Sequence, residues 1–279
     1  MRRCALLLAL VCVLAPASAS ARGSAGIASL QVALRAHGTY PGTVDGYAGP
    51  GTRRAVRAYQ RRAGLAVDGV AGPRTRRALG RLARPRLGRR ALRLGSVGGD
   101  VSALQFLLEW AGFPSGTVDG GFGPHVDAAL RRFQRRAGLG ADGVAGPHTI
   151  AALRRPPPRN PVALRAPVLA PLGDPFGPRG AGFHPAADFP APTGTSVRAA
   201  RSGRVVFAGW DAGGYGMLVV LGHGRGLTTW YAHLSRILVG RGEPVRVGER
   251  IGRVGATGLA TGPHLHFEVR DRGAAVRPF

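Results

Sequence analysis

The segment Gly262-Pro263-His264-Leu265-His266-Phe267-Glu268 decides how the C-terminal part of this chain folds. A glycine and a proline precede a run in which polar and large apolar residues alternate, and this pattern predicts a strand over His264–Arg270. Side chains two positions apart in a strand point to the same face of the sheet. His264 and His266 are therefore expected to lie side by side.

Short β-branched segments bounded by glycine continue this pattern upstream, from about residue 167. Strands are predicted over Gly203–Gly209, over Met217–Leu221 and Leu227–Tyr231 with a hairpin turn between them, and over Arg250–Val254. No long amphipathic helix pattern interrupts them. Residues 167–279 are therefore predicted to form a small, mainly antiparallel β domain.

Two further segments of this region carry residue types that hold a catalytic zinc, His184-Pro185-Ala186-Ala187-Asp188 and Tyr231-Ala232-His233-Leu234-Ser235. Two imidazoles and a carboxylate fill three tetrahedral positions and leave the fourth for water. Pro185 favours an extended segment or loop, so folding must bring this segment to the His266 strand. His223 lies in the predicted hairpin turn, where a local hydrogen-bonding role is expected.

A direct repeat with a constant offset of 74 residues occupies the first half of the chain. Leu30-Gln31 recurs as Leu104-Gln105, and Gln60–Leu65 recurs as Gln134–Leu139. Helical spacing and Asp-Gly turns predict three helices in each copy. Three histidines of the copies have no counterpart in the sister copy and are expected at the surface: His37, His125 and His148.

Composition divides the chain into six segments. They are a signal peptide over residues 1–21, module 1 over 24–82, a basic and flexible linker over 83–99, module 2 over 100–155, a proline-rich linker over 156–166, and the β domain over 167–279. Consecutive prolines favour an extended spacer. The modules and the β domain are therefore expected to be separate bodies.

The N-terminus has the pattern of a secretory signal peptide. Arg2 and Arg3 precede an apolar run, Ala5–Leu14, that is too short to span a bilayer. An exported protein without a membrane span is expected, and a lipid-modified Cys12 is disfavoured because the bulky Val11 precedes it. The only other cysteine, Cys4, also lies in this segment, so any metal of the mature chain must be held by His, Asp or Glu.

The formal net charge is +25, and all 39 basic residues are arginines. Without lysine the chain has no P-loop lysine, no Schiff-base lysine and no Ser-Lys dyad. The excess charge favours a polyanionic partner. Nucleic acid is not expected, because the chain carries an export signal and has no aromatic-interleaved basic motif or zinc-finger spacing. Anionic cell-wall polymers are the expected partners.

The two modules resemble the peptidoglycan-binding modules of bacterial wall hydrolases. The resemblance covers residues 26–82 and 100–156 and rests on four features: the Leu-Gln start, the Val-Asp-Gly-x-x-Gly-Pro turn, the aromatic-Gln pair and the closing Asp-Gly-x-x-Gly-Pro-x-Thr. It implies that each module binds the wall. The individual repeated glycines, aspartates and aromatic residues are expected to serve the fold.

Residues 167–279 resemble the lysostaphin-type zinc metallopeptidases, which cut peptidoglycan cross-links. Besides the histidine segments quoted above, Ala191–Val197 and Gly214–Gly216 match that family. Ala186 replaces a common glycine, and Gly222 replaces a common acidic residue, but neither change removes a ligand. The chain is therefore expected to be multidomain, with two small all-α three-helix modules followed by a mainly antiparallel β metallopeptidase domain.

The resemblance implies that His184, Asp188 and His266 bind Zn²⁺ and that His233 and His264 are catalytic. The chain has no His-Glu-x-x-His sequence, so the glutamate base of that class is absent. One of His233 and His264 is expected to take the proton of the attacking water, and the other to stabilise the oxyanion.

Three functions follow from these observations. The first is a secreted, extracellular or wall-associated zinc endopeptidase that hydrolyses peptide bonds in peptidoglycan stem peptides or cross-bridges, with peptidoglycan as both substrate and tether. The second is a non-catalytic wall-binding protein or an activator of another wall hydrolase, which would be expected to have lost ligands. The third, a basic nucleic-acid-binding protein, conflicts with the export signal.

Overall fold

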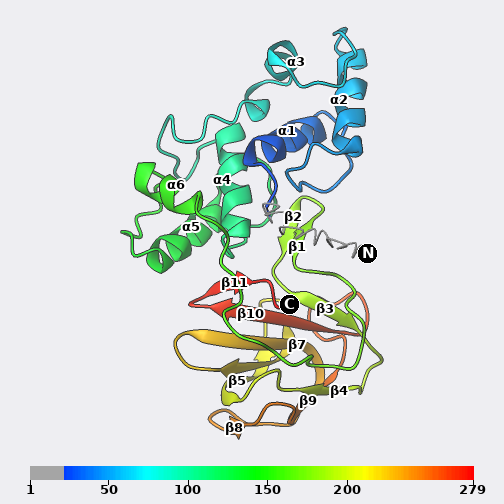
Figure 1. Cartoon of the computed structure of the whole chain (residues 1–279), viewed down its shortest axis with the longest axis vertical. Coiled ribbons are helices and arrows are strands. Elements are labelled where there is room, and N and C mark those ends of the chain that lie inside the picture. Colours follow the sequence, from blue (N-terminus) through cyan, green and yellow to red (C-terminus); the bar gives the residue numbers. More distant parts are fainter. Residues whose placement is uncertain (1–21) are drawn as a thin grey trace, which may run out of the picture.

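The computed structural model describes residues 22–279, so the predicted signal peptide lies outside the described residues. A helical part rests on a β part (Figure 1). This arrangement confirms the predicted fold class. The helices are α1 (Ala25–Ala36), α2 (Pro50–Arg62), α3 (Pro73–Ala78), the short 3₁₀ helix η1 (Arg81–Ala83), α4 (Gly99–Trp110), α5 (Pro124–Arg136) and α6 (Pro147–Leu153). None of the described helices is long and apolar enough to cross a membrane.

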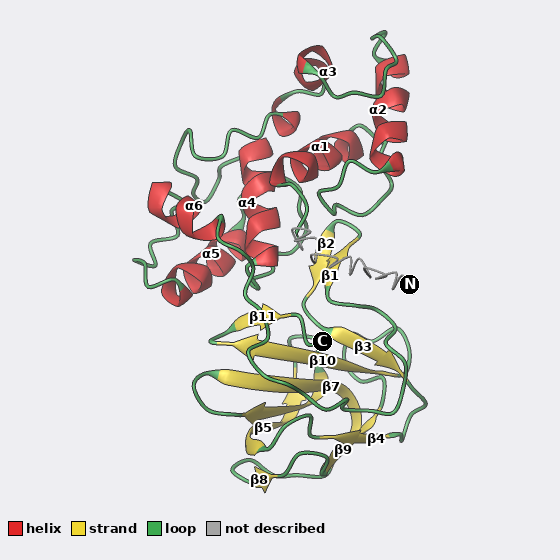
Figure 2. Cartoon of the chain, viewed as in Figure 1, coloured by secondary structure: helices red, strands yellow, loops and turns green. Residues whose placement is uncertain are grey.

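The β part contains a two-stranded hairpin and a nine-stranded sheet, in which all described pairs are antiparallel (Figure 2). The sheet has the order β11-β10-β7-β6-β5-β8, with β3 beside β10 and with β9 between β7 and β4. The strands are β1 (Gly177–Arg179), β2 (Gly182–His184), β3 (Ala187–Pro190), β4 (Ser196–Arg198), β5 (Gly203–Asp211), β6 (Gly216–Gly222), β7 (Leu227–Ile237), β8 (Pro244–Val245), β9 (Arg250–Val254), β10 (His264–Asp271) and β11 (Ala274–Val276).

The alternation of β10 turns its polar residues away from the domain core. Leu265 and Phe267 are fully buried and belong to the main apolar cluster of the sheet. His264, His266 and Glu268 occupy the alternate positions. The period of two therefore places both histidines and the glutamate on one face, as the sequence predicts for the histidines.

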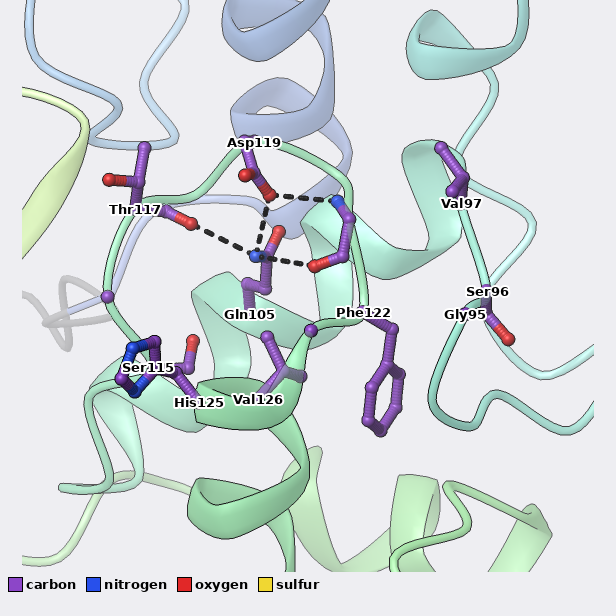
Figure 3. A pocket seen from close by; sticks show the side chains of 13 residues that line it. Gly95, Ser96, Val97, Gln105, Ser115, Thr117, Asp119, Phe122, His125 and Val126 are labelled. Atoms are coloured by element: carbon purple, nitrogen blue, oxygen red, sulfur yellow. Dashed lines mark hydrogen bonds between the residues drawn. The ribbon is translucent and has the colours of Figure 1, made fainter.

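A buried glutamine holds an Asp-Gly turn in each half of each module. In module 2, Gln105 Nε2 donates a 3.0 Å hydrogen bond to Asp119 Oδ1 (Figure 3), and Gln105 Oε1 accepts one from the backbone N–H of Gly120. Equivalent pairs form around Gln31, Gln60 and Gln134. The four turn glycines have φ between 73° and 85°, a region that glycine adopts without steric cost. The repeated residues therefore serve the fold, as expected.

The two modules pack against each other, although module 1 also has an apolar cluster of its own, and the segment between them is not the flexible linker that was predicted. Helix α1 packs along α4, and Ala28 of α1 belongs to the same apolar cluster as Leu104 and Leu108 of α4. In the linker, Leu92 is fully buried and pairs with Ala145. Leu87 and Leu92 anchor the linker to the apolar cluster of module 2, whereas Leu94 is exposed. The overall composition of the linker does not distinguish these leucines.

Module 2 packs directly on the β domain, although the proline-rich linker predicted separate bodies. Ala275 of β11 donates its N–H to the carbonyl of Gly112 at 2.9 Å. Arg136 of α5 forms a 2.7 Å ion pair with Asp271. Gly112 has a φ of 88°, and a Cβ at this position would overlap the carbonyl oxygen of Ala275. The missing side chain therefore permits the close approach of the two domains.

Both modules hold the tip of the β1–β2 hairpin. The N–H of Val44 in module 1 donates to the carbonyl of Gly180 at 2.8 Å, and the N–H of Val118 in module 2 donates to the carbonyl of Ala181 at 2.6 Å. Val44 and Val118 are equivalent positions of the repeat. Because β2 ends at His184, the modules help to position the segment that carries this histidine.

Candidate metal centre

The structure brings the five predicted site residues together. His184 ends β2, Asp188 lies in β3, His233 in β7, and His264 and His266 in β10. Strands β3 and β7 both pair with β10, and the register places Asp188 opposite His266. Two overlapping groups have potential ligand atoms within 4.8 Å of one another: His184, Asp188 and His266, and His233, His264 and His266.

His184 is 1% exposed, and a backbone carbonyl selects its tautomer. Its Nδ1 lies 3.2 Å from the carbonyl oxygen of Pro175. A carbonyl only accepts hydrogen bonds, so Nδ1 carries the proton and Nε2 presents a lone pair. Among residues 22–279, Nε2 has no hydrogen-bond partner, yet it lies 3.2 Å from Asp188 Oδ2. A proton or a cation between Nε2 and Oδ2 stabilises both atoms, and one metal ion bound by both would fill that role.

His266 lies between two carboxylates. Its Nδ1 is 2.9 Å from Asp188 Oδ1, and its Nε2 is 3.1 Å from Glu268 Oε1. Burial alone would lower the pKa of His266, but the hydrogen bonds to Asp188 and Glu268 raise it to about 9. Likewise, burial alone would raise the pKa of Asp188, but His184 and His266 hold it well below its usual range. The site therefore strongly favours positive charge.

The donor set fits zinc. When the Nε2–H of His266 is directed at Glu268, its Nδ1 is free to face a metal, as in carboxylate–histidine–zinc arrangements. His184 Nε2, an oxygen of Asp188 and His266 Nδ1 then offer two nitrogens and one oxygen, a ligand set typical of catalytic zinc. Residues 22–279 contain no cysteine that could compete as a ligand. The assignment of these three residues as ligands stays a prediction.

His233 and His264 share one hydrogen-bonding arrangement. The Nδ1–H of His233 donates to the carbonyl of Thr257, and the Nδ1–H of His264 donates to the carbonyl of Gly262, both at 2.8 Å. The Nε2 atoms of both rings are therefore unprotonated in the neutral form. The two ring centroids are 4.8 Å apart, and His264 Nε2 lies 3.8 Å from Asp188 Oδ2. Burial lowers the pKa of His233, which favours its neutral form.

The backbone at His233 is strained. Its φ of 59° is uncommon for a residue other than glycine, and the pairing of β6 with β7 shifts register at this point. Surrounding hydrogen bonds hold this conformation. The N–H of His233 donates to the carbonyl of Tyr215, while the Thr257 hydroxyl donates to the carbonyl of Leu234 and accepts from the N–H of Met217. This backbone conformation places the His233 ring beside the His264 ring, with the two centroids 4.8 Å apart.

A buried network behind His266 has roles that the sequence analysis did not assign. Glu268 is fully buried and accepts hydrogen bonds from the Tyr215 hydroxyl at 2.7 Å and from Arg270 Nε at 2.6 Å. Arg270 also lies over the ring of Trp230, 4.0 Å from its centroid. Strand alternation places Glu268 beside the histidines, but its partner Tyr215 comes from another part of the chain. Only the tertiary structure shows that contact.

The remaining histidines behave as predicted. His223 lies outside the cluster, with Nδ1 2.9 Å from the carbonyl of Ser202 and Nε2 2.8 Å from the Thr229 hydroxyl, which is a local hydrogen-bonding role. The alanine at position 186 is buried and does not separate His184 from Asp188. The three histidines of the modules are exposed: His37, His125 and His148.

Comparison with known proteins agrees with this geometry. Residues 182–278 match peptidase family M23, and residues 23–79 and 97–153 each match the putative peptidoglycan binding domain. Residues 182–278 therefore form a domain of peptidase family M23, and the chain also carries two modules of the peptidoglycan-binding type. The exact limits predicted for each domain stay a prediction.

Several relatives match about a third of the chain. The DD-carboxypeptidase/endopeptidase Mpg of Neisseria meningitidis serogroup B is 50% identical over 96 residues, which are 34% of this chain and 22% of that protein. The murein hydrolase activator EnvC of Escherichia coli is 43% identical over 88 residues, 32% of this chain and 21% of that protein. The chain thus spans about a fifth of the length of these curated relatives. The solved catalytic domain of lysostaphin from Staphylococcus simulans is 37% identical, with 39% of this chain and 89% of that chain covered and a TM-score of 0.37.

Proposed function

We propose that the C-terminal domain is a secreted, zinc-dependent endopeptidase that hydrolyses peptide bonds in peptidoglycan stem peptides or cross-bridges, and that the two modules tether it to the wall. The convergence of His184, Asp188 and His266 beside two further histidines carries this proposal. The match to peptidase family M23 supports peptide hydrolysis, and the name of the Neisseria relative supports endopeptidase activity. The two modules of the peptidoglycan-binding type support peptidoglycan as the source of the peptide.

The residues of the chain divide the chemistry among them. When bound, zinc supplies Lewis acidity toward the scissile carbonyl and lowers the pKa of the attacking water. The neutral Nε2 of either His233 or His264 takes the proton of that water and later gives it to the leaving amine. The other imidazole, protonated on Nε2, donates a hydrogen bond to the developing oxyanion. The carbonyls of Thr257 and Gly262 hold both rings in place by accepting from Nδ1.

The two modules raise the effective concentration of substrate at the site. A second attachment makes encounter with the wall intramolecular, without any new catalytic contact. The modules contact the hairpin that leads to His184 through backbone hydrogen bonds. The proposed wall-binding modules and the segment that carries His184 are therefore in direct contact.

The second candidate function is activation of another wall hydrolase without catalysis. The similarity to the murein hydrolase activator of Escherichia coli favours it. A protein of that kind has no need to keep a complete constellation for hydrolysis. All five residues are present here, and their potential ligand atoms form two overlapping groups within 4.8 Å that share His266. We therefore favour the enzyme.

Release of dye-labelled fragments from purified peptidoglycan tests the proposal. A chelator should abolish release by the native chain, and added zinc should restore it. Asp188→Ala should stay inactive with zinc, whereas Glu249→Ala, which removes an exposed carboxylate of the same domain, should respond as the native chain does. Release that continues in the chelator would contradict a metal enzyme. Wall binding without release by the zinc-loaded chain would favour the activator.

A further inference from the structure

The two sister modules have one fold but different charge. Over the matched residues 23–79, module 1 has nine arginines and two aspartates, a net charge of +7. Over the equivalent residues 97–153, module 2 has four arginines and five acidic residues, a net charge of −1. Because both copies reach the same fold, the fold does not require the positive charge of module 1. The charge therefore points to a partner of module 1 that module 2 does not share.

Helix α2 places three arginines along one groove of module 1. Arg54, Arg57 and Arg61 are spaced so that their side chains share one face of the helix, and all three are exposed. They line a groove of about 520 Å³ that Tyr40 and Gly42 also border. A rise of about 1.5 Å per residue spreads the three positions over about 10 Å. The groove is thus bordered by a row of cations.

The row of cations is not neutralised within the protein. Across residues 22–279, none of the three arginines forms an ion pair with a carboxylate, and Asp68 alone interacts with Arg57 electrostatically at longer range. In module 2 the position of Arg54 is Ala128, and Arg131, the counterpart of Arg57, is paired with Asp127 at 2.8 Å. Arg135, the counterpart of Arg61, is the one member of that row in module 2 that is exposed and outside the ion pairs of residues 22–279, whereas module 1 offers three such cations.

The helix that carries the three arginines of module 1 lies away from the β domain. Helices α2 and α3 lie at the end of the helical part farthest from the sheet (Figure 1). Module 2, in contrast, uses Arg136 of its own second helix to pair with Asp271 of the β domain. The same helix therefore docks on the catalytic domain in one module and faces outward in the other.

We propose that the arginine groove of module 1 binds a linear wall polymer with repeating phosphodiester groups, of the polyol-phosphate type. The guanidinium fork matches the oxygens of a phosphate in a bidentate contact. A row of three cations is expected to bind a polymer with regularly spaced negative charges more tightly than it binds the isolated carboxylates of a stem peptide. This inference goes beyond the proposed hydrolysis. It gives the modules different roles, because module 2 docks on the peptidase domain and module 1 binds an anionic polymer.

Poly(glycerol phosphate) labelled at one end is the probe, titrated with the full chain by fluorescence anisotropy at several salt concentrations. The variant R54Q/R57Q/R61Q should bind about 10-fold more weakly or worse, and its salt slope should be about 2 shallower, because three phosphate contacts are lost. The matched control R225Q/R241Q/R246Q removes three exposed arginines of the β domain. The control should keep the native affinity within about 2-fold and the native slope.

Each outcome decides the proposal, provided that thermal melting shows both variants folded. Equal losses in both variants would overturn it, because binding would then follow net charge alone. Tighter binding to duplex DNA than to the polymer, lost in the groove variant, would also overturn it and assign the arginines to nucleic acid. Peptidoglycan stripped of phosphate polymers should be cleaved by the groove variant at the native rate. A failure of the groove is therefore distinguishable from a failure of the proposed hydrolysis.

Discussion

Glu268 Oε1 lies 3.1 Å from His266 Nε2, and this contact decides which nitrogen of His266 faces Asp188. A carboxylate accepts the Nε2–H and leaves Nδ1 as the nitrogen available to a metal. Arg270 and Tyr215 donate to the same carboxylate and hold it in place. Glu268 is therefore a positioning residue for the proposed zinc ligand.

Replacing Glu268 with Gln should weaken zinc binding by about 10- to 100-fold, because the amide carries no charge to orient and polarise His266. Competition with a chelating dye measures this affinity directly. The exposed Glu249→Gln is the control and should bind zinc as the native chain does. An unchanged zinc affinity in the folded Glu268→Gln protein would show that His266 is oriented by other contacts.

Removal of the two proposed proton-transfer histidines should separate catalysis from metal binding. His233→Ala and His264→Ala should each lower turnover by about 100-fold or more, since general acid–base catalysis is lost. Zinc content, measured by elemental mass spectrometry, should stay near one per chain in both variants and fall in His184→Ala. Loss of zinc from the His233 or His264 variant would contradict the division of roles.

Glu109 makes the stability of module 2 depend on pH. This residue of α4 is fully buried, and neither carboxylate oxygen has a hydrogen-bond partner within residues 22–279. Burial raises its pKa well above the usual value of 4.5. The folded state therefore keeps a proton that the unfolded state releases, so this contribution to stability is complete at low pH and is lost as pH rises toward the raised pKa.

Glu109→Gln should remove this dependence. At about pH 8 the variant should be more stable to urea than the native chain by at least about 1 kcal/mol, the free energy of one pKa unit. At about pH 4 the two should differ much less, because the carboxyl is protonated in both states. A difference that is the same at both pH values would show that Glu109 is not held protonated by burial.

Gly112 and its counterpart Gly38 offer a matched test of domain docking. Both have positive φ, 88° and 71°, so alanine costs backbone strain at either position. A Cβ at Gly112 would overlap the Ala275 carbonyl, whereas a Cβ at Gly38 would meet nothing within 4 Å. Gly112→Ala should therefore cost about 1–3 kcal/mol more in unfolding free energy than Gly38→Ala.

The same pair of variants should differ in hydrogen exchange. Gly112→Ala should speed exchange of amides in the Gly177–His184 hairpin, because the docked module helps to hold it. Gly38→Ala should leave that exchange unchanged. Equal exchange in the two proteins would mean that the hairpin is stable without module 2.

Local pattern predicted the elements well. Strand alternation placed His264 and His266 on one face, and Asp-Gly turns marked the helices of both modules, because these signals depend on neighbouring residues. The resemblance to a known family predicted that His184 and Asp188 lie beside His266. The assembly of the parts was not predictable in this way. A linker rich in arginine was expected to be flexible, but Leu92 buries itself against module 2, and Gly112 looks like any turn glycine until Ala275 is placed beside it.

Mass spectrometry of purified peptidoglycan after incubation with the full chain tests the central claim most directly. The zinc-loaded native chain should release new peptide ends that name the bond cut, and neither chelator-treated protein nor Asp188→Ala should release any. New ends that appear equally with Asp188→Ala would contradict a metal centre built on Asp188. Tight wall binding without new ends, from several types of peptidoglycan, would contradict the proposed hydrolysis itself.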